Sequence, residues 1–263
     1  MTVALSSLHL TPAKTAGEDN FPVGSWLLPA AIRPNVHAFY RFARAADDIA
    51  DDPVLSPEQK LSRLFALDPA LLGRGAPYAR RLIAAFKCDA VRNRTPDWQD
   101  LVDYCTLSAV PVGRFLLDLH GEGEAAHGPC DALCVALQVL NHIQDLGIDR
   151  ARLNRVYLPL DWLAEAGTSV DAIDDSTTGP QLRQVIDRAL DQVDLLLVEA
   201  ARLPHVARGL RLRLEATLVL FIARRLSHKL RHSDPLAIAA LKRNRPDHMA
   251  CTFCGMIRGL MGR

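Results

Sequence analysis

The segment spanning residues 130–149 restricts the fold of this chain more than any other. Its apolar residues recur at the spacing of a buried α-helix. Three polar residues interrupt this apolar pattern at steps of four, so they fall near one face of the helix. These polar residues are Asn141, Asp145 and Asp149. The segment therefore predicts a core helix with a polar face.

Similar helical patterns, punctuated by glycine and proline, fill most of the chain, and no stretch shows the sustained alternation typical of a strand. Leucine and alanine dominate and aromatic residues make up only 6%, which also favours helices. Because no segment has the composition of a linker, we expect one all-α domain over residues 1–263. We expect its helices at residues 34–51, 57–67, 76–92, 97–120, 130–149, 180–203, 206–231, 236–243 and 248–261.

The charge of the chain is nearly balanced, with 31 Lys and Arg residues against 30 Asp and Glu residues. A protein that follows a nucleic-acid backbone usually carries a marked basic excess, so nucleic acid is not an expected partner. No apolar run is long enough to predict a transmembrane helix, and the first residues lack the pattern of a secretory signal. We therefore expect a cytoplasmic protein with reduced cysteines.

A second acidic cluster lies earlier in the chain, within residues 43–52. Asp47 and Asp51 are four residues apart in an expected helix, so both carboxylates project from one face. Like charges at this spacing repel each other, and burial strengthens the repulsion. Two such helices facing each other would hold Mg²⁺, which takes oxygen ligands and is usually shared with substrate phosphates. The alternative is a pair of solvated acidic faces on a non-catalytic helical assembly protein.

At this point the chain resembles the squalene/phytoene synthase family, from about Asn20 to Pro159 and more weakly beyond. The resemblance implies an all-α class I isoprenoid synthase fold with a central cavity, Mg²⁺ as cofactor and a prenyl diphosphate as substrate. It implies metal ligands at Asp47, Asp51, Asn141 and Asp145, with Asp149 completing the second motif. The segments that carry it are NFPVGSWLLP (20–29), HAFYRFARAADDIAD (37–51), YCTLSAVPVGR (104–114) and LQVLNHIQDLGIDRARLNRVYLP (137–159).

A further group of residues matches positions around the substrate diphosphate in that family. Phe21 matches an aromatic residue of an N-terminal flap, in which Asn20 is placed to donate a hydrogen bond. Arg155, like Arg150, follows the second acidic motif and either screens the departing diphosphate or solvates a helix end. The expected diphosphate-binding set is Asn20, Phe21, Tyr40, Arg44, Gln138 and Arg155.

Residues 18–25 and 108–114 are similar to one bacterial subgroup, the hydroxysqualene synthases of hopanoid-type squalene biosynthesis. This similarity implies that presqualene diphosphate is ionised, rearranged and quenched by water to hydroxysqualene. Tyr104 matches a tyrosine near the carbocation. Ser108, one helical turn further on, either holds the attacking water or bonds back to the carbonyl four residues earlier. The alternative is condensation of two prenyl diphosphates, such as farnesyl diphosphate, to presqualene or prephytoene diphosphate, as in squalene or phytoene synthases.

Segments near the C-terminus bear on the partners of the protein. The basic, amphipathic segment 208–230 is typical of a core helix with a solvated face. Peripheral docking on a membrane is the alternative for this segment. The apolar residues of 249–263 form either a lid on the core or a peripheral membrane contact, which a lipid-like substrate favours. Other enzymes of the squalene pathway are further candidate partners.

His142, inside the second acidic motif, is expected to be a packing residue rather than a base.

Overall fold

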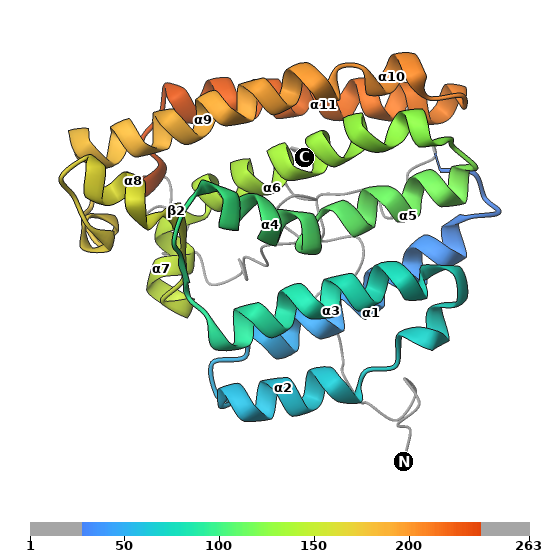
Figure 1. The fold of residues 1–263 in the computed structure, drawn as a ribbon, viewed down its shortest axis with the longest axis horizontal. Coiled ribbons are helices and arrows are strands. Elements are labelled where there is room, and N and C mark those ends of the chain that lie inside the picture. The colour runs from blue at the N-terminus through green and yellow to red at the C-terminus, as the bar shows by residue number, and fades with distance from the viewer. Residues whose placement is uncertain (1–27, 238–263) are drawn as a thin grey trace.

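A computed structural model describes residues 28–237 of the chain, and within them nearly all regular structure is helical (Figure 1). The expected helix at 248–261 and most of that at 236–243 lie outside the described residues, as do Asn20 and Phe21. Short 3₁₀ turns at Pro69–Gly75, Glu124–Ala126 and Val170–Ile173 occupy the connections. The helices are α1 (Arg33–Asp51), α2 (Pro57–Ala66), α3 (Ala76–Val91), α4 (Trp98–Ser108), α5 (Val110–His120), α6 (His127–Gln144), α7 (Leu146–Leu153), α8 (Leu160–Glu165), α9 (Pro180–Ala200), α10 (Leu203–Val206) and α11 (Leu210–Arg231).

Capping residues in the sequence set several of these bounds. The Ser56 side chain accepts a hydrogen bond from the backbone N–H of Gln59, whose own side chain bonds back to Ser56, so a capping box opens α2. The Asp97 side chain caps α4 by accepting a hydrogen bond from the backbone N–H of Asp100. Gly121 ends α5 with φ 69°, a left-handed conformation that glycine adopts without a steric penalty.

Two expected helices are each divided into two. The expected helix 97–120 breaks at Ala109 because Pro111, within the first turn of α5, lacks the N–H that would continue α4. The expected helix 130–149 breaks at Asp145, which has φ −100° and ψ 8° and separates α6 from α7. The expectation of one continuous helix was wrong in both places, and only the first break has a proline beside it.

A short parallel pair of strands, absent from the sequence prediction, joins two distant parts of the chain. In it β1 (Arg94–Thr95) pairs with β2 (Val156–Pro159), with Arg94 opposite Val156. Strands of this length show no alternation that could be read from a sequence. The pairing places the residues after α7 beside the end of α3, which matters for the site described below.

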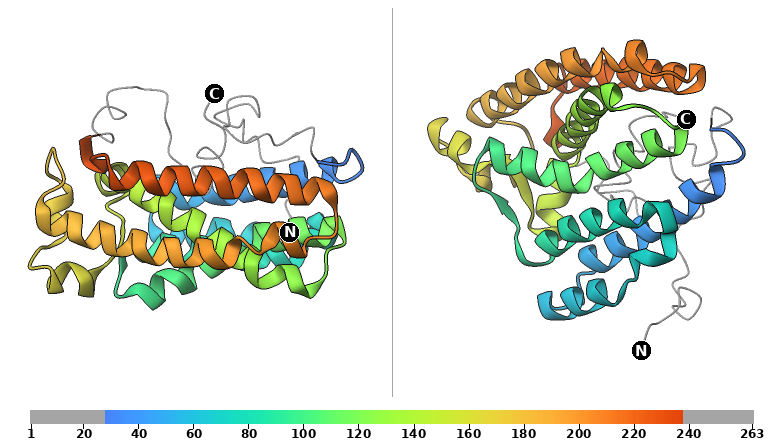
Figure 2. Two further views of the ribbon diagram at one scale, coloured as in Figure 1. Left: turned by 90° about the horizontal axis from the view of Figure 1, so that it is seen from above. Right: turned by 45° about the vertical axis from the view of Figure 1, so that its right-hand side comes forward.

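The helices lie in three layers, with α6 in the middle (Figures 1 and 2). On one side α6 packs against α9 and α11, and on the other against α4 and α5. The lower layer holds α1, which packs against α2 and α3. Because α6 is covered on both sides, almost every side chain from Pro129 to Ile143 is buried. The polar residues Gln138, Asn141 and His142 of α6 are therefore buried.

Candidate active site

The polar face of α6 and α7 is buried in the interior. Gln138, Asn141, Asp145 and Asp149 each expose 4% or less of their surface. Buried carboxylates and amides require partners or a bound charge, because taking them out of water is costly. This face is therefore the first element of a candidate site.

The second acidic element comes from α1. Asp47 is 3% exposed. Arg44 on the same helix places its guanidinium 2.7 Å from Oδ1 of Asp48 and 3.8 Å from Oδ2 of Asp47. Tyr40 lies one turn before Arg44 and is half-buried. The structure thus gathers Arg44, Asp47 and Tyr40 on one helix, as their spacing predicts, and adds Asp48 as the partner of Arg44.

The acids of α1 and α7 act on each other electrostatically. Burial raises the pKa of Asp149 well above its usual value, and the neighbouring charges of Asp145 and Asp51 raise it further. Oδ2 of Asp149 has no hydrogen-bond partner among the described residues. Because Asp51 lies on α1 and Asp149 on α7, the two acidic motifs share one electrostatic environment.

This concentration of buried acid suits a divalent cation. A cation would relieve the repulsion that raises the pKa of Asp149 and would give its unpartnered oxygen a ligand. Within residues 28–237, no three His, Cys, Asp or Glu side chains stand close enough to enclose an ion alone. An open set of this kind fits Mg²⁺, which commonly keeps waters and shares its sites with substrate phosphates.

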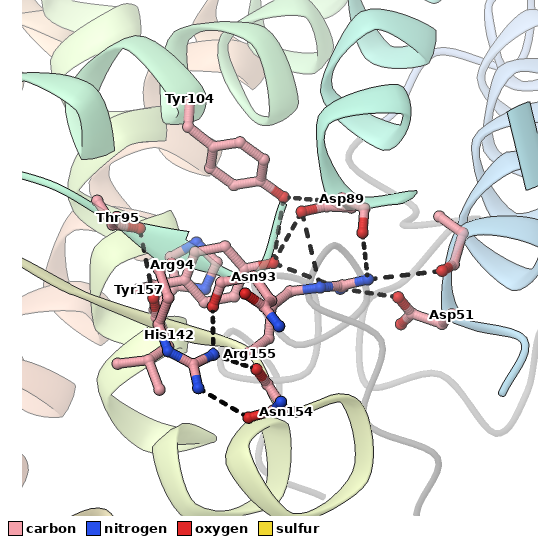
Figure 3. A network of polar contacts seen from close by, with 12 residues as sticks. Asp51, Asp89, Asn93, Arg94, Thr95, Tyr104, His142, Asn154, Arg155 and Tyr157 are labelled. Carbon is pink, nitrogen blue, oxygen red and sulfur yellow. Dashed lines mark hydrogen bonds and ion pairs between the residues drawn. The ribbon is translucent and has the colours of Figure 1, made fainter. Parts of the chain in front are cut away.

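Arg155 connects the acidic motif of α1 to α3 (Figure 3). Its Nη1 donates to Oδ1 of Asp51 at 2.9 Å, and its Nη2 donates to the backbone oxygen of Asp89 at 3.3 Å. The residue is 4% exposed. It reaches this position because the backbone N–H of Val156 bonds to the carbonyl of Asn93, where the two strands meet. Arg150 instead forms an ion pair with Asp174 at 2.7 Å, so it stabilises a helix end.

Asp89, on α3, is the residue that sequence reasoning missed. The Tyr104 hydroxyl donates to Oδ2 of Asp89 at 2.7 Å, and the Tyr157 hydroxyl donates to Oδ1 at 3.2 Å (Figure 3). Burial raises the pKa of Asp89, while the charge of Arg155 opposes the rise. An acid inside the apolar pattern of 76–92 is the same signal that singled out Asp145, and it would have identified Asp89.

Aromatic rings line the space next to this carboxylate. The rings of His142 and Tyr157 stack with centroids 3.6 Å apart, and that of Tyr104 lies 5.9 Å from His142. Burial, followed by the charge of Arg155, lowers the pKa of His142 to about 3, so the imidazole is neutral near pH 7. Its Nε2 lies 3.3 Å from the side-chain nitrogen of Gln138. His142 is thus a packed, hydrogen-bonded residue.

Ser108 is buried, and its hydroxyl makes no hydrogen bond within the described part of the chain. By contrast, Thr106 on the same helix bonds back to the carbonyl of Val102 at 2.9 Å. The expected alternative for Ser108, a bond to the carbonyl four residues earlier, is therefore wrong. Its hydroxyl is available to another partner.

Two contacts of α4 and α5 with α6 flank Ser108 and Gln138. Tyr104 lies beside His142, and a Cβ atom at Gly113 would come within 2.5 Å of the Cys134 sulfur. As residue numbers rise from 104 to 113 they fall from 142 to 134, so α4 and α5 run antiparallel to α6, and Ser108 and Gln138 both lie between these two contacts along the chain. Oε1 of Gln138 also lacks a hydrogen-bond partner among the described residues.

Known proteins resemble this chain in sequence and in overall fold. The squalene/phytoene synthase family model matches residues 14–76 and 74–247. The chain is 39% identical to a hydroxysqualene synthase of Sinorhizobium fredii over 83% of this chain and 82% of that protein. It is 38% identical to a hydroxysqualene synthase of Rhodopseudomonas palustris, over 88% of this chain and 86% of that protein. A crystal structure of a squalene synthase from Alicyclobacillus acidocaldarius, 29% identical, superposes with a TM-score of 0.68 over 80% of this chain and 87% of that chain.

The fold is that of an all-α isoprenoid synthase, which confirms the fold class implied by the sequence resemblance. The chain belongs to the squalene/phytoene synthase family. It is an enzyme that acts on prenyl diphosphates, so the alternative of a non-catalytic assembly protein is set aside.

Proposed function

We propose that this enzyme converts presqualene diphosphate to hydroxysqualene. The observation that carries the proposal is that its relatives from Sinorhizobium and Rhodopseudomonas, matched over most of their length, are both hydroxysqualene synthases. The proposed reaction breaks the carbon–oxygen bond to the diphosphate, which leaves with the electron pair. The carbocation rearranges, and water forms a new carbon–oxygen bond with release of a proton.

The acidic motifs and Arg155 would act on the diphosphate. Bound Mg²⁺ would supply Lewis-acid stabilisation of the leaving group, and its proposed ligands are Asp47, Asp51, Asn141, Asp145 and Asp149. The Arg44 and Arg155 guanidinium groups would offer forked donors to phosphate oxygens. Gln138, Tyr40 and the flap residues Asn20 and Phe21 complete the proposed set. Asp51 holds Arg155 through a 2.9 Å hydrogen bond, which would fix the guanidinium before substrate binds.

The ring cluster beside Asp89 would face the carbocation. The face of an aromatic ring carries partial negative charge and attracts a cation. Asp89 accepts hydrogen bonds from the hydroxyls of Tyr104 and Tyr157, which orients both rings and turns their oxygens toward the carboxylate. The hydroxyls are thereby held in place and are less available to trap the cation themselves.

Ser108 and Gln138 would hold the water that ends the reaction. Both side chains are buried, on the packed helices α4 and α6, and each has a polar atom without a hydrogen-bond partner among the described residues. A hydroxyl both donates and accepts, and an amide oxygen accepts, so together they satisfy one water molecule. The attacking water oxygen would thus approach the carbocation from the side of α4, the helix that also carries Tyr104.

The test is conversion of presqualene diphosphate by the pure enzyme with Mg²⁺ and without NADPH, in ¹⁸O-labelled water. We expect an alcohol that carries ¹⁸O. Ser108→Ala should lower the share of alcohol and raise that of hydrocarbons, whereas Thr106→Ala, whose hydroxyl is already bonded to its own helix, should not. Squalene formed only with NADPH would refute the proposed reaction. An unchanged product spectrum in Ser108→Ala would refute only the role of Ser108.

The second candidate is the condensation of two farnesyl diphosphates to presqualene diphosphate. It is favoured by the similarity to the solved squalene synthase from Alicyclobacillus. Incubation with farnesyl diphosphate alone separates the two, because the proposed enzyme should leave it unchanged whereas a condensing enzyme should consume it and release inorganic diphosphate.

A further inference from the structure

A row of large apolar side chains on α11 faces solvent. Leu210, Leu214, Leu218 and Phe221 are 68%, 51%, 44% and 62% exposed, respectively. Their spacing of four, four and three residues puts them on one side of the helix, here called the α11 apolar face. The opposite side of α11, with Leu212, Ala216 and Leu220, is buried. Figure 1 shows α11 at the outer edge of the molecule, next to α9 and α10.

Basic side chains border the α11 apolar face. The single acidic residue of α11, Glu215, is half-buried. Contiguous exposed apolar surface bordered by polar residues marks interaction sites. An amphipathic helix with apolar residues between basic ones is suited to an anionic lipid surface. The exposed basic residues of α11 are Arg211, Arg213, Arg224, Arg225 and Lys229.

Charge favours an anionic lipid surface over two other possible partners of the α11 apolar face, namely a second copy of the chain and the C-terminal residues 238–263. A second copy of the chain, docked through the same face, would bring two sets of arginines together. The C-terminal residues 238–263 carry five basic side chains (Lys242, Arg243, Arg245, Arg258 and Arg263) against one acidic side chain, Asp247. The net positive charge of that segment does not complement the same arginines. An anionic lipid surface complements both the apolar residues and the charge.

We propose that the α11 apolar face docks the enzyme on the surface of an anionic lipid bilayer. No helix within residues 28–237 is long and apolar enough to cross a membrane, so the contact would be peripheral. Docking would hold an enzyme that handles prenyl chains next to the phase in which such chains dissolve. The inference rests on the surface of α11 and does not depend on which prenyl reaction is catalysed.

The test is co-sedimentation of the full chain with vesicles of phosphatidylcholine, with and without phosphatidylglycerol. Wild-type protein should sediment with the anionic vesicles and be released by salt. The double variant Leu214→Ser, Phe221→Ser should bind at least about tenfold more weakly, because it removes apolar area that would enter the interface. Arg224→Gln with Arg225→Gln should weaken binding to anionic vesicles and reduce its salt dependence.

A matched control lies on α9. Leu195 and Val198 are 65% and 70% exposed, but their neighbours on α9 include Asp191 and Asp194. Leu195→Ser with Val198→Ser should leave vesicle binding unchanged. An equal loss in this variant would overturn the assignment to α11, as would wild-type protein that ignores both vesicle types. Self-association of wild-type protein in analytical ultracentrifugation, abolished in the α11 double variant, would identify a second copy as the occupant instead.

Discussion

The helices α6 and α11 depart from the usual burial pattern in opposite directions. α6 buries Gln138 and Asn141, while α11 exposes Leu210 and Phe221 to solvent. Each arrangement is unfavourable in the isolated chain, since buried polar groups lose water and exposed apolar groups order it. The comparison shows that both departures are informative. Buried polar residues mark the candidate active site, and exposed apolar residues mark the proposed docking surface.

The cause of the difference is the number of sides on which each helix is covered. α6 has neighbours on both sides, so polar residues on it must find partners inside the protein. Within residues 28–237, α11 packs chiefly against α9, α10 and α6, and its side with Leu210 and Phe221 is exposed. The variants below test whether the two helices differ in energetic terms as they do in exposure.

The largest expected effect follows removal of the buried guanidinium group of Arg155. Arg155→Met should lower the free energy of unfolding by about 3–5 kcal/mol, because Asp51 and Asp89 lose a buried partner. Arg150→Met breaks an ion pair whose acid, Asp174, has a side chain 54% exposed, and should cost less than about 1 kcal/mol. Urea unfolding of both variants measures the difference. Equal losses would show that burial does not distinguish the two arginines.

The next effect is on turnover. Asp145→Asn and Asp47→Asn are nearly isosteric, so each should fold normally yet lower turnover at least about 10²-fold, because stabilisation of the departing diphosphate is lost. The control is Asp131→Asn, on the same helix as Asn141 but paired with Arg114 at 2.5 Å. Initial rates across a Mg²⁺ titration measure the effect. Wild-type rates at limiting Mg²⁺ in the first two variants would contradict the proposed metal site.

A smaller, pH-dependent effect should come from His142. Its folded-state pKa of about 3 lies below its ordinary value of 6.5, so the unfolded chain binds the extra proton more readily. The stability associated with neutral His142 is therefore present above pH 6.5 and lost as the pH falls toward 3, by at most about 1.4 kcal/mol per pH unit. His142→Gln should flatten this slope. Urea unfolding of both proteins from about pH 7 to about pH 4 checks the difference, and parallel slopes would contradict it.

The smallest effect should come from the α11 apolar face itself. Leu218 and Leu220 are two residues apart, but Leu218 is 44% exposed and Leu220 only 6%. Leu220→Ala should cost about 2–5 kcal/mol, whereas Leu218→Ala should stay within about 0.5 kcal/mol of wild type. Thermal unfolding of the two variants measures this. A large loss for Leu218→Ala would mean that the α11 face is part of the core.

Much of the fold follows from local sequence signals. The expected helix 34–51 corresponds to α1 at Arg33–Asp51, and 57–67 to α2 at Pro57–Ala66, because apolar periodicity and caps act over a few residues. The break at Asp145 and the pairing of Arg94 with Val156 were not predicted. Neither has a local signal, since no proline stands beside Asp145 and the strand pairing joins residues far apart in the chain.

The sequence by itself determined that residues 47–51 and 141–149 carry polar and acidic side chains at helical spacing, and that segment 208–230 is basic and amphipathic, because both facts depend only on residue type and the period of a helix. Only the tertiary structure decided that Asp89 accepts hydrogen bonds from Tyr104 and Tyr157, and that Arg155 reaches Asp51. It also decided which face of α11 stays open. These outcomes depend on which helices become neighbours, and a helix pattern specifies a buried face without specifying what covers it.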